Sequence, residues 1–268
     1  MALAAGLFNA YWTALAKPVL ARHTSREFTL AFRALTSLFL LPFAFWQWTW
    51  PLPAVWWGWM TLAGLCEGLR IWFLTRGVKR DYYSTYAFYN LSPFFVVLVA
   101  PRFLGEVQTP WLLAGGLLIA AGSLVFYHLG RWSWPGLWGA LLSTGGVVAA
   151  KLALQYSPPL TLAFWAFAVG ALILIPLEAV GGRTIRWKRL AKGFRSIVPV
   201  AFWSLVATIL FYTALAHAPA SKVNPLVRAN LLFGFFFSYY LLREREEWRS
   251  KVLGGLLILS GLALVMVS

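Results

Sequence analysis

Long apolar segments alternate with short polar ones along the whole chain. A helix needs roughly 17 to 25 mostly apolar residues to cross a bilayer. By that length the pattern predicts ten transmembrane helices, near residues 2–20, 27–46, 54–76, 81–101, 110–128, 134–156, 160–180, 196–217, 219–241 and 251–267. The segments between them are too short for a soluble domain. We therefore expect an all-α polytopic membrane protein.

Several short sequences recur between the two halves of the chain, which indicates an internal repeat. The sequence TLAF at residues 29–32 returns at 161–164, and Lys17 and Lys151 precede the two copies at nearly equal distances. The sequence GGLLI at residues 115–119 returns at 254–258. We predict two five-helix repeats, residues 1–130 and 131–268. Because five is odd, the copies should lie inverted in the membrane, as in secondary transporters that bind substrate near the midplane between repeats.

The composition agrees with a membrane protein. Hydrophobic residues make up 60% of the 268 residues and charged residues 12%, with a mean hydropathy of +0.71, whereas soluble proteins carry roughly 25% charged residues. The single cysteine, Cys66, excludes an intrachain disulfide and a cysteine-based metal cluster. We expect no metal site and no other cofactor, and we place the protein in an inner or plasma membrane.

The formal net charge of +15 would suggest a nucleic-acid partner in a soluble protein. Here the basic residues lie mainly between apolar segments, so membrane topology explains them better and we expect no nucleic acid. The odd-numbered loops hold 17 of the 23 Lys and Arg residues, and the even-numbered loops hold only Arg102 and Lys222. The positive-inside rule then predicts cytoplasmic odd loops and external termini.

Two motifs resemble a known family. The sequence FLGEVQT at residues 103–109, followed by Gly115 and Gly116, resembles the LGE-x-x-T … G-x-x-L-I-x-x-G signature of the drug/metabolite transporter superfamily, EamA branch. The second half keeps the glycines but has the charged run 243–247 in place of LGE, and residues 214–221 resemble the family's A-L-x-x-x-x-A-S entry to the ninth helix.

This resemblance covers essentially the whole chain and implies a ten-helix permease. It does not name a substrate, because the family carries amino acids, sugars, nucleotide-sugars, phosphorylated metabolites and drugs. It implies that the first, third, fourth, sixth, eighth and ninth helices line the cavity. Family members usually have both termini inside, contrary to the charge distribution, which we follow here.

Charges inside the predicted spans mark the candidate site, because a charge in hydrocarbon is costly unless it faces a bundle interior or a water-filled cavity. Arg228 lies within the ninth span. Glu67 and Arg70 share a helix face, so we expect them to pair, with Glu67 as the candidate coupling residue. Arg33, Lys151 and Arg228 then lack an intramembrane acid, and an anion, carbonyls or water must compensate them. The alternative is that Arg228 has a structural role, either because its side chain reaches the membrane interface or because it pairs with a neighbouring residue.

Polar side chains on other spans add weaker candidates. Tyr82, Tyr86, Tyr89 and Asn90 fall on one face of the fourth helix, where they could hydrogen-bond a substrate, although aromatic packing explains them equally well. Because the repeats are inverted, Lys17 and Lys151 are expected near opposite membrane faces. The candidate substrate contacts are Arg228, Lys151, Arg70, Arg33, Lys17, Tyr86, Tyr89, Asn90 and Tyr212.

These patterns favour a secondary transporter that moves a small polar solute by alternating access. The intramembrane excess of cations over Glu67 predicts an anion bearing a carboxylate or phosphate, held bidentately by Arg228 with Lys151 as a second contact. Alternatives are an exporter of amino acids or other zwitterionic or drug-like solutes, a lipid flippase and a head-group enzyme. An enzyme is disfavoured because such chemistry needs clustered carboxylates, histidines or a metal. The expected partners are the lipid bilayer and the solute. For the oligomeric state, we expect a monomer.

Overall fold

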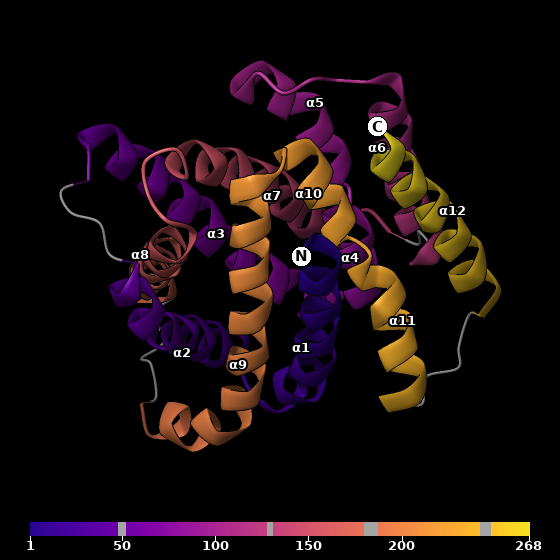
Figure 1. Ribbon diagram of the computed structural model, residues 1–268. Coiled ribbons are helices and arrows are strands. Elements are labelled where there is room, and N and C mark those ends of the chain that lie inside the picture. Colours follow the sequence, from indigo (N-terminus) through magenta and orange to yellow (C-terminus); the bar gives the residue numbers. More distant parts are fainter. Residues whose placement is uncertain (48–51, 128–130, 180–186, 242–247) are drawn as a thin grey trace.

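The computed structural model describes residues 1–47, 52–127, 131–179, 187–241 and 248–268, and all regular structure in these ranges is helical (Figure 1). The all-α prediction is therefore confirmed. The helices are α1 (Ala2–Arg22), α2 (Ser25–Trp46), α3 (Ala54–Arg80), α4 (Tyr82–Tyr89), α5 (Ser92–Leu104), α6 (Pro110–Phe126), α7 (Trp134–Ala153), α8 (Pro159–Ala179), α9 (Trp187–His217), α10 (Ala220–Val227), α11 (Asn230–Leu241) and α12 (Trp248–Val267).

Six described segments are long and apolar enough to cross a membrane, which fits a polytopic membrane protein. They are Glu27–Trp46, Tyr82–Leu104, Trp134–Ala153, Pro159–Leu177, Phe194–His217 and Trp248–Val267. The ten membrane crossings stay a prediction. The charged run 243–247 and the basic residues Arg183 and Arg186 lie outside the described residues.

The predicted fourth and ninth spans are each broken near the middle, which the sequence pattern did not indicate. The fourth span consists of α4 and α5 with a break at residues 90–91, and the ninth consists of α10 and α11 with a break at residues 228–229. Pro93 follows the first break, and its missing backbone N–H accounts for the interruption before it. Pro225 lies inside α10, and the second break is a tighter turn after it, where the backbone N–H of Arg228 donates to the carbonyl of Pro225 at 2.9 Å and that of Ala229 to Leu226 at 3.1 Å.

The predicted limits of α3 and α9 were too short. α3 continues to Arg80 rather than ending near residue 76, and α9 begins at Trp187 rather than near residue 196. In both cases a basic segment continues the helix beyond its apolar part. Apolar length gives only the part of a helix that suits hydrocarbon, so charged turns outside the membrane escape it.

α6 and α12 pack against each other at very short range through four glycines (Figure 1). A Cβ atom on Gly115 would lie 2.8 Å from the carbonyl oxygen of Gly261, and one on Gly254 would lie 2.6 Å from that of Gly122. The early glycine of each helix therefore meets the late glycine of the other, so the two helices run antiparallel. Small residues permit this approach of backbones, as in many membrane helix pairs.

The other helix contacts follow the same pattern in both halves of the chain. α3 packs against α7 and α8, and α9 packs against α1 and α2. α7 packs against α4 and α5, and α1 packs against α10 and α11. Each half thus interlocks with the other through corresponding helices, and the core of the bundle lies between them.

The helix connections gather on two faces of the bundle. On one face, Lys79 Nζ donates to the carbonyl of His23 at 2.6 Å, and the His23 ring lies 3.2 Å from Ser196 Oγ. We call this the basic face, because it carries the described basic residues of the odd loops, such as Arg22 and Arg80. We call the other end, where α5, α7 and α9 terminate, the opposite face.

Candidate functional site

A central cavity of ≈ 180 Å³ lies among α1, α2, α3, α4, α7, α8, α9, α10 and the start of α11. Near the basic face its lining includes Leu20 of α1, Val78 of α3 and Tyr82 of α4. None of the described residues that connect α5 to α6, α7 to α8 or α9 to α10 lines it. The cavity therefore extends from the middle of the bundle toward the basic face.

Most of the predicted site residues line this cavity, although they come from different helices. The lining includes Lys17, Arg33, Glu67, Arg70, Tyr86, Tyr89, Tyr212 and Arg228. Lys151 and Asn90 do not line it. Lys151 binds backbone carbonyls at the opposite face. Asn90 lines a second, smaller cavity of ≈ 70 Å³ and accepts from Arg228.

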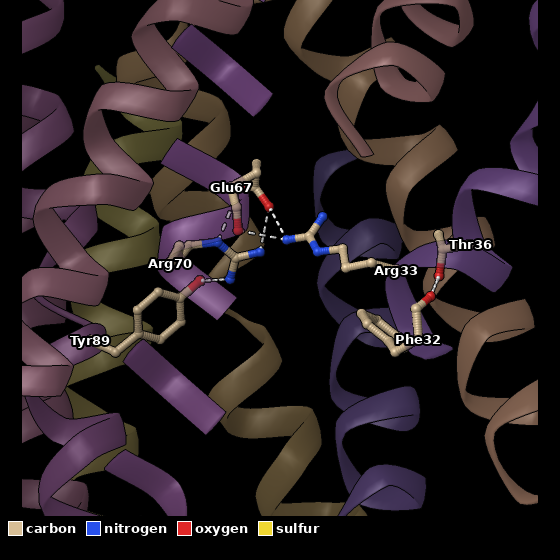
Figure 2. Close-up of polar contacts among 6 residues, drawn as sticks. All are labelled: Phe32, Arg33, Thr36, Glu67, Arg70 and Tyr89. Carbon is tan, nitrogen blue, oxygen red and sulfur yellow. Dashed lines mark hydrogen bonds and ion pairs between the residues drawn. The ribbon is translucent and has the colours of Figure 1, made fainter. Parts of the chain in front are cut away.

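Glu67 lies between two arginines (Figure 2). Arg70 donates to it from two nitrogens, Nε to Oε1 at 3.1 Å and Nη2 to Oε2 at 2.6 Å. Arg33 approaches from the other side, with Nη2 at 2.9 Å from Oε2 and at 2.8 Å from the Glu67 carbonyl. The predicted Glu67–Arg70 pair is confirmed, and its remaining side is occupied by a second cation.

The expectation that Arg33 lacks an acidic partner is wrong. Its side chain is fully buried, pairs with Glu67 and lies over the Phe167 ring at 4.3 Å. Sequence spacing finds partners on one helix, but Arg33 is on α2 and Glu67 on α3. Only the packing of the helices brings these two residues together.

Arg228 lies at the break between α10 and α11 and contacts the break between α4 and α5. Its Nη1 donates to Asn90 Oδ1 at 3.1 Å, and its Nη2 donates to Ser92 Oγ. Its guanidinium lies over the Tyr89 ring at 4.5 Å. Arginine keeps its charge and suits such planar contacts, so the two broken helices are joined by one buried cation. A bidentate contact to a substrate would require Asn90 and Ser92 to be displaced.

The cavity carries more positive than negative charge. Of the described residues that line it, four are basic, namely Lys17, Arg33, Arg70 and Arg228, and one is acidic, Glu67. Several buried nitrogens of the lining find no hydrogen-bond partner among the residues that the structure describes, namely Arg33 Nε and Nη1, Arg228 Nε and Asn224 Nδ2. Unsatisfied buried donors are costly. The cavity lining therefore combines an excess of positive charge with buried donors that the described residues leave without acceptors.

The tyrosines of α4 form an aromatic wall near the basic face. The rings of Tyr82 and Tyr86 lie 4.7 Å apart, and those of Tyr86 and Tyr89 lie 6.1 Å apart. The Tyr89 hydroxyl accepts from Arg70 Nη1 at 3.0 Å. Asn90 donates from Nδ2 to the carbonyl of Tyr86 at 2.8 Å, which aims its Oδ1 at Arg228. Of the predicted polar face, the three tyrosines therefore line the cavity, whereas Asn90 binds Arg228.

Lys151 closes the end of α9 at the opposite face. Its Nζ donates to the carbonyl of Leu215 at 2.6 Å and to that of Ala218 at 3.0 Å. Glu106, from the FLGEVQT sequence, accepts from the backbone N–H of Ala220 at 2.6 Å and of Ser221 at 2.9 Å. A cation at a helix C-terminus and an anion at a helix N-terminus both interact favourably with the helix dipole. Together the two side chains fix the turn between α9 and α10.

Several polar residues of the lining escaped prediction from the sequence. They are uncharged and scattered through apolar helices, namely Thr13, Thr75, Ser143, Ser204, Thr208, Asn224 and Asn230. Asn224 and Asn230 had a usable signal, because two amides flank Arg228 in an otherwise apolar segment. The hydroxyl residues had none, since serine and threonine also bond their own helix carbonyls, as Thr13 does with Asn9.

Comparison with known proteins gives a family and a fold. The family model of the EamA-like transporter family matches residues 132–267, just over half of the chain. A solved crystal structure, described only as that of a protein, aligns with a TM-score of 0.71 and 16% sequence identity, over 99% of this chain and 97% of that one. That similarity shows the fold alone. No curated protein matches the chain. With the family match added to its apolar helices and its buried charged cavity, the chain is an integral multi-pass membrane protein that belongs to the EamA-like transporter family.

Proposed function

We propose that the chain is a secondary transporter that moves a small anionic metabolite, bearing a carboxylate or a phosphate, through the central cavity by alternating access. The observation that carries this proposal is the charge of the cavity, where four basic lining residues face one carboxylate. In low dielectric such an excess attracts anions and repels cations. The buried unpaired nitrogens of Arg33 and Arg228 supply the donors for the anion.

Alternating access rests on two inverted repeats, residues 1–130 and 131–268. Three observations support this arrangement: the antiparallel contact of α6 and α12, the corresponding helix contacts of the two halves, and the breaks in the fourth and ninth spans. Repeats inverted about an axis in the membrane plane would place the broken helices together at the midplane. Ion and substrate sites of secondary transporters are often built on such discontinuous helices.

We expect the substrate to bind the arginines that have the fewest partners within the protein. Arg70 is held by Glu67 and Tyr89, so we assign it a supporting role. Arg33 has one ion pair and two unpaired nitrogens, and Arg228 has no ion pair among the described residues. We expect the anion to bind between Arg33 and Arg228, with Lys17 as a contact nearer the basic face.

A zwitterionic solute is the second candidate, because Glu67 lines the same cavity and could receive an amine. The two candidates differ in what Glu67 does. For an anion, Glu67 competes with the substrate for Arg33. For a zwitterion, Glu67 must release an arginine and bind the ammonium group instead.

Binding of solutes of different charge tests the proposal. Anionic, zwitterionic and cationic solutes are measured on the purified protein and on Arg228→Gln and Arg33→Gln, with Lys222→Gln as the matched control outside the cavity. Loss of a buried charge contact should weaken anion binding by about 2–5 kcal/mol in both arginine variants. Preferred binding of cations, or unchanged anion binding in both variants, would show that these arginines are structural.

A further inference from the structure

The two terminal nitrogens of Arg228 are bound by uncharged groups at the break between α4 and α5. Nη1 donates to Asn90 Oδ1 at 3.1 Å, and Nη2 donates to Ser92 Oγ. Asn90 directly follows α4, and Ser92 is the first residue of α5. All three residues are buried. The charge of one helix break is therefore held by a neutral amide and a neutral hydroxyl of the other break.

The partners of Arg228 differ from those of the other two arginines in the cavity. Arg33 and Arg70 both donate to the carboxylate of Glu67. Arg228 has no ion pair among the residues that the structure describes. A carboxylate or phosphate adds the attraction between opposite charges to its hydrogen bonds, and low dielectric strengthens this attraction. Such an anion is therefore a stronger acceptor for Arg228 than the neutral groups that it binds.

Two other donors near Arg228 can bind an anion without displacing a group of the protein. Arg228 Nε and Asn224 Nδ2 are buried and find no partner among the described residues. Both residues line the central cavity, whereas Asn90 lines the second, smaller cavity and Ser92 lines neither of these two. An anion in the central cavity can therefore bind these two donors first. It reaches both terminal nitrogens only by displacing Asn90 and Ser92.

We propose that Asn90 and Ser92 are internal acceptors that compete with the transported anion for Arg228. They hold the terminal nitrogens of Arg228 until the anion takes their place, and this exchange releases the contact between the two helix breaks. The inference rests on the proposed anion transport and deepens it, because it states how binding of the anion alters the protein. It also gives Ser92, which lines neither cavity, control over the affinity for the anion.

Competition for Arg228 discriminates against neutral solutes. Every ligand that binds both terminal nitrogens must break the same two hydrogen bonds. An anion offsets this cost through charge attraction, whereas a neutral solute of the same shape only exchanges one neutral acceptor for another. The contact also joins the two halves of the chain, and α5 packs against α10 beside it. Its release therefore removes a polar link between the halves at the centre of the bundle.

Binding of simple anions to Ser92→Ala tests the competition. Inorganic phosphate and acetate are titrated into the purified protein, and their dissociation constants are measured by calorimetry. Alanine removes the hydroxyl that binds Arg228 but keeps the Ser92 carbonyl, which accepts from Thr144 Oγ1 at 3.4 Å. We expect the dissociation constants to fall about tenfold, the effect of one hydrogen bond to a charged group. If Ser92 only positioned Arg228 or touched the anion, binding would weaken instead.

Three further variants make the sign of the effect decisive. Asn90→Ala should also tighten binding, which keeps the test valid if Ser92→Ala does not fold. Asn90→Asp should weaken binding, because a carboxylate at this position would form an internal ion pair with Arg228. Ser123→Ala is the matched control and should change nothing. Ser123 is a buried serine of α6 that donates to the Ile119 carbonyl of its own helix and lines neither cavity.

Thermal unfolding of the same variant gives a second readout. Without added anion, Ser92→Ala should unfold at a lower temperature than the wild type, because it has lost a buried hydrogen bond. This difference should shrink when phosphate or acetate saturates the site, since the anion then binds Arg228 in both proteins. A purely structural role of Ser92 would leave the difference the same at every anion concentration.

The inference is overturned if Ser92→Ala and Asn90→Ala bind both anions as the wild type does or more weakly. That failure can be told apart from failure of the proposed transport, which Arg228→Gln tests. If Arg228→Gln weakens anion binding while neither alanine variant tightens it, the transporter proposal stands and the competition falls. If neither the wild type nor the alanine variants bind an anion, both proposals fall.

Discussion

The guanidinium of Arg228 lies 4.5 Å from the centre of the Tyr89 ring. The two residues are 139 positions apart in the sequence, the same separation as between Gly115 and Gly254 of the repeated GGLLI sequence. In the register of that repeated sequence, Arg228 of the second proposed repeat corresponds to Tyr89 of the first. A two-fold axis between the halves would pass through this contact. At this place one half of the chain carries an arginine and the other a tyrosine, although the helices around them make similar contacts in both halves.

Glu67 should contribute more to stability than either arginine that it binds. Arg33→Gln leaves Glu67 paired with Arg70, whereas Glu67→Gln leaves the buried Arg33 and the half-buried Arg70 without a carboxylate. Removing one partner of a buried ion pair costs about 3–5 kcal/mol. We expect thermal unfolding in detergent to show a larger loss for Glu67→Gln than for Arg33→Gln. A coupling near zero between the two substitutions in a double-mutant cycle would contradict the contact.

Glu67 should also be the residue that couples transport to protons. It is the acidic residue of the cavity lining, and its protonation would release Arg33 for the substrate. We expect Glu67→Gln to lose uphill accumulation driven by a pH gradient in proteoliposomes, yet to retain counterflow of substrate. Both rates are normalised to folded protein. Unchanged accumulation in this variant would indicate exchange or facilitated diffusion.

The glycine contact between α6 and α12 should tolerate no side chain. Gly254→Ala would place a Cβ atom 2.6 Å from the carbonyl oxygen of Gly122, so the helices must separate. We expect a loss of about 1–3 kcal/mol, the usual cost of overpacking, measured by thermal unfolding. Gly234→Ala in α11 is the matched control, because nothing lies within 4 Å of its added Cβ. An equal effect of both substitutions would mean that the contact is looser than observed.

The basic face should be cytoplasmic, with both termini outside. The prediction follows from the 17 basic residues of the odd-numbered loops, which include the loop at residues 183–195. Reporters that are active on only one side of the membrane, fused after Ser268, should be active outside the cytoplasm. An active cytoplasmic reporter at this end, together with external labelling of the loop at residues 183–195, would reverse the orientation.

The sequence by itself determined the class of the fold and selected most of the charged residues that line the central cavity. Apolar length predicts where helices lie because the bilayer imposes a common span, and the FLGEVQT and GGLLI sequences point to the family that the comparison shows. Buried charges are visible in the sequence because they interrupt apolar segments. For this reason Arg33, Glu67, Arg70 and Arg228 could be selected before any contact was known.

The tertiary structure decided which of these charges meet and which way they face. Arg33 and Glu67 are on neighbouring helices, and Lys151 turns away from the cavity to the carbonyls of α9. No local pattern encodes these contacts, because they depend on the order in which the helices pack. The positions of the helix breaks at residues 90–91 and 228–229 were likewise not predicted from the local sequence. A proline shows that a helix can break, but only the tertiary structure brings the two breaks together, where the Arg228 side chain donates to Asn90 and Ser92.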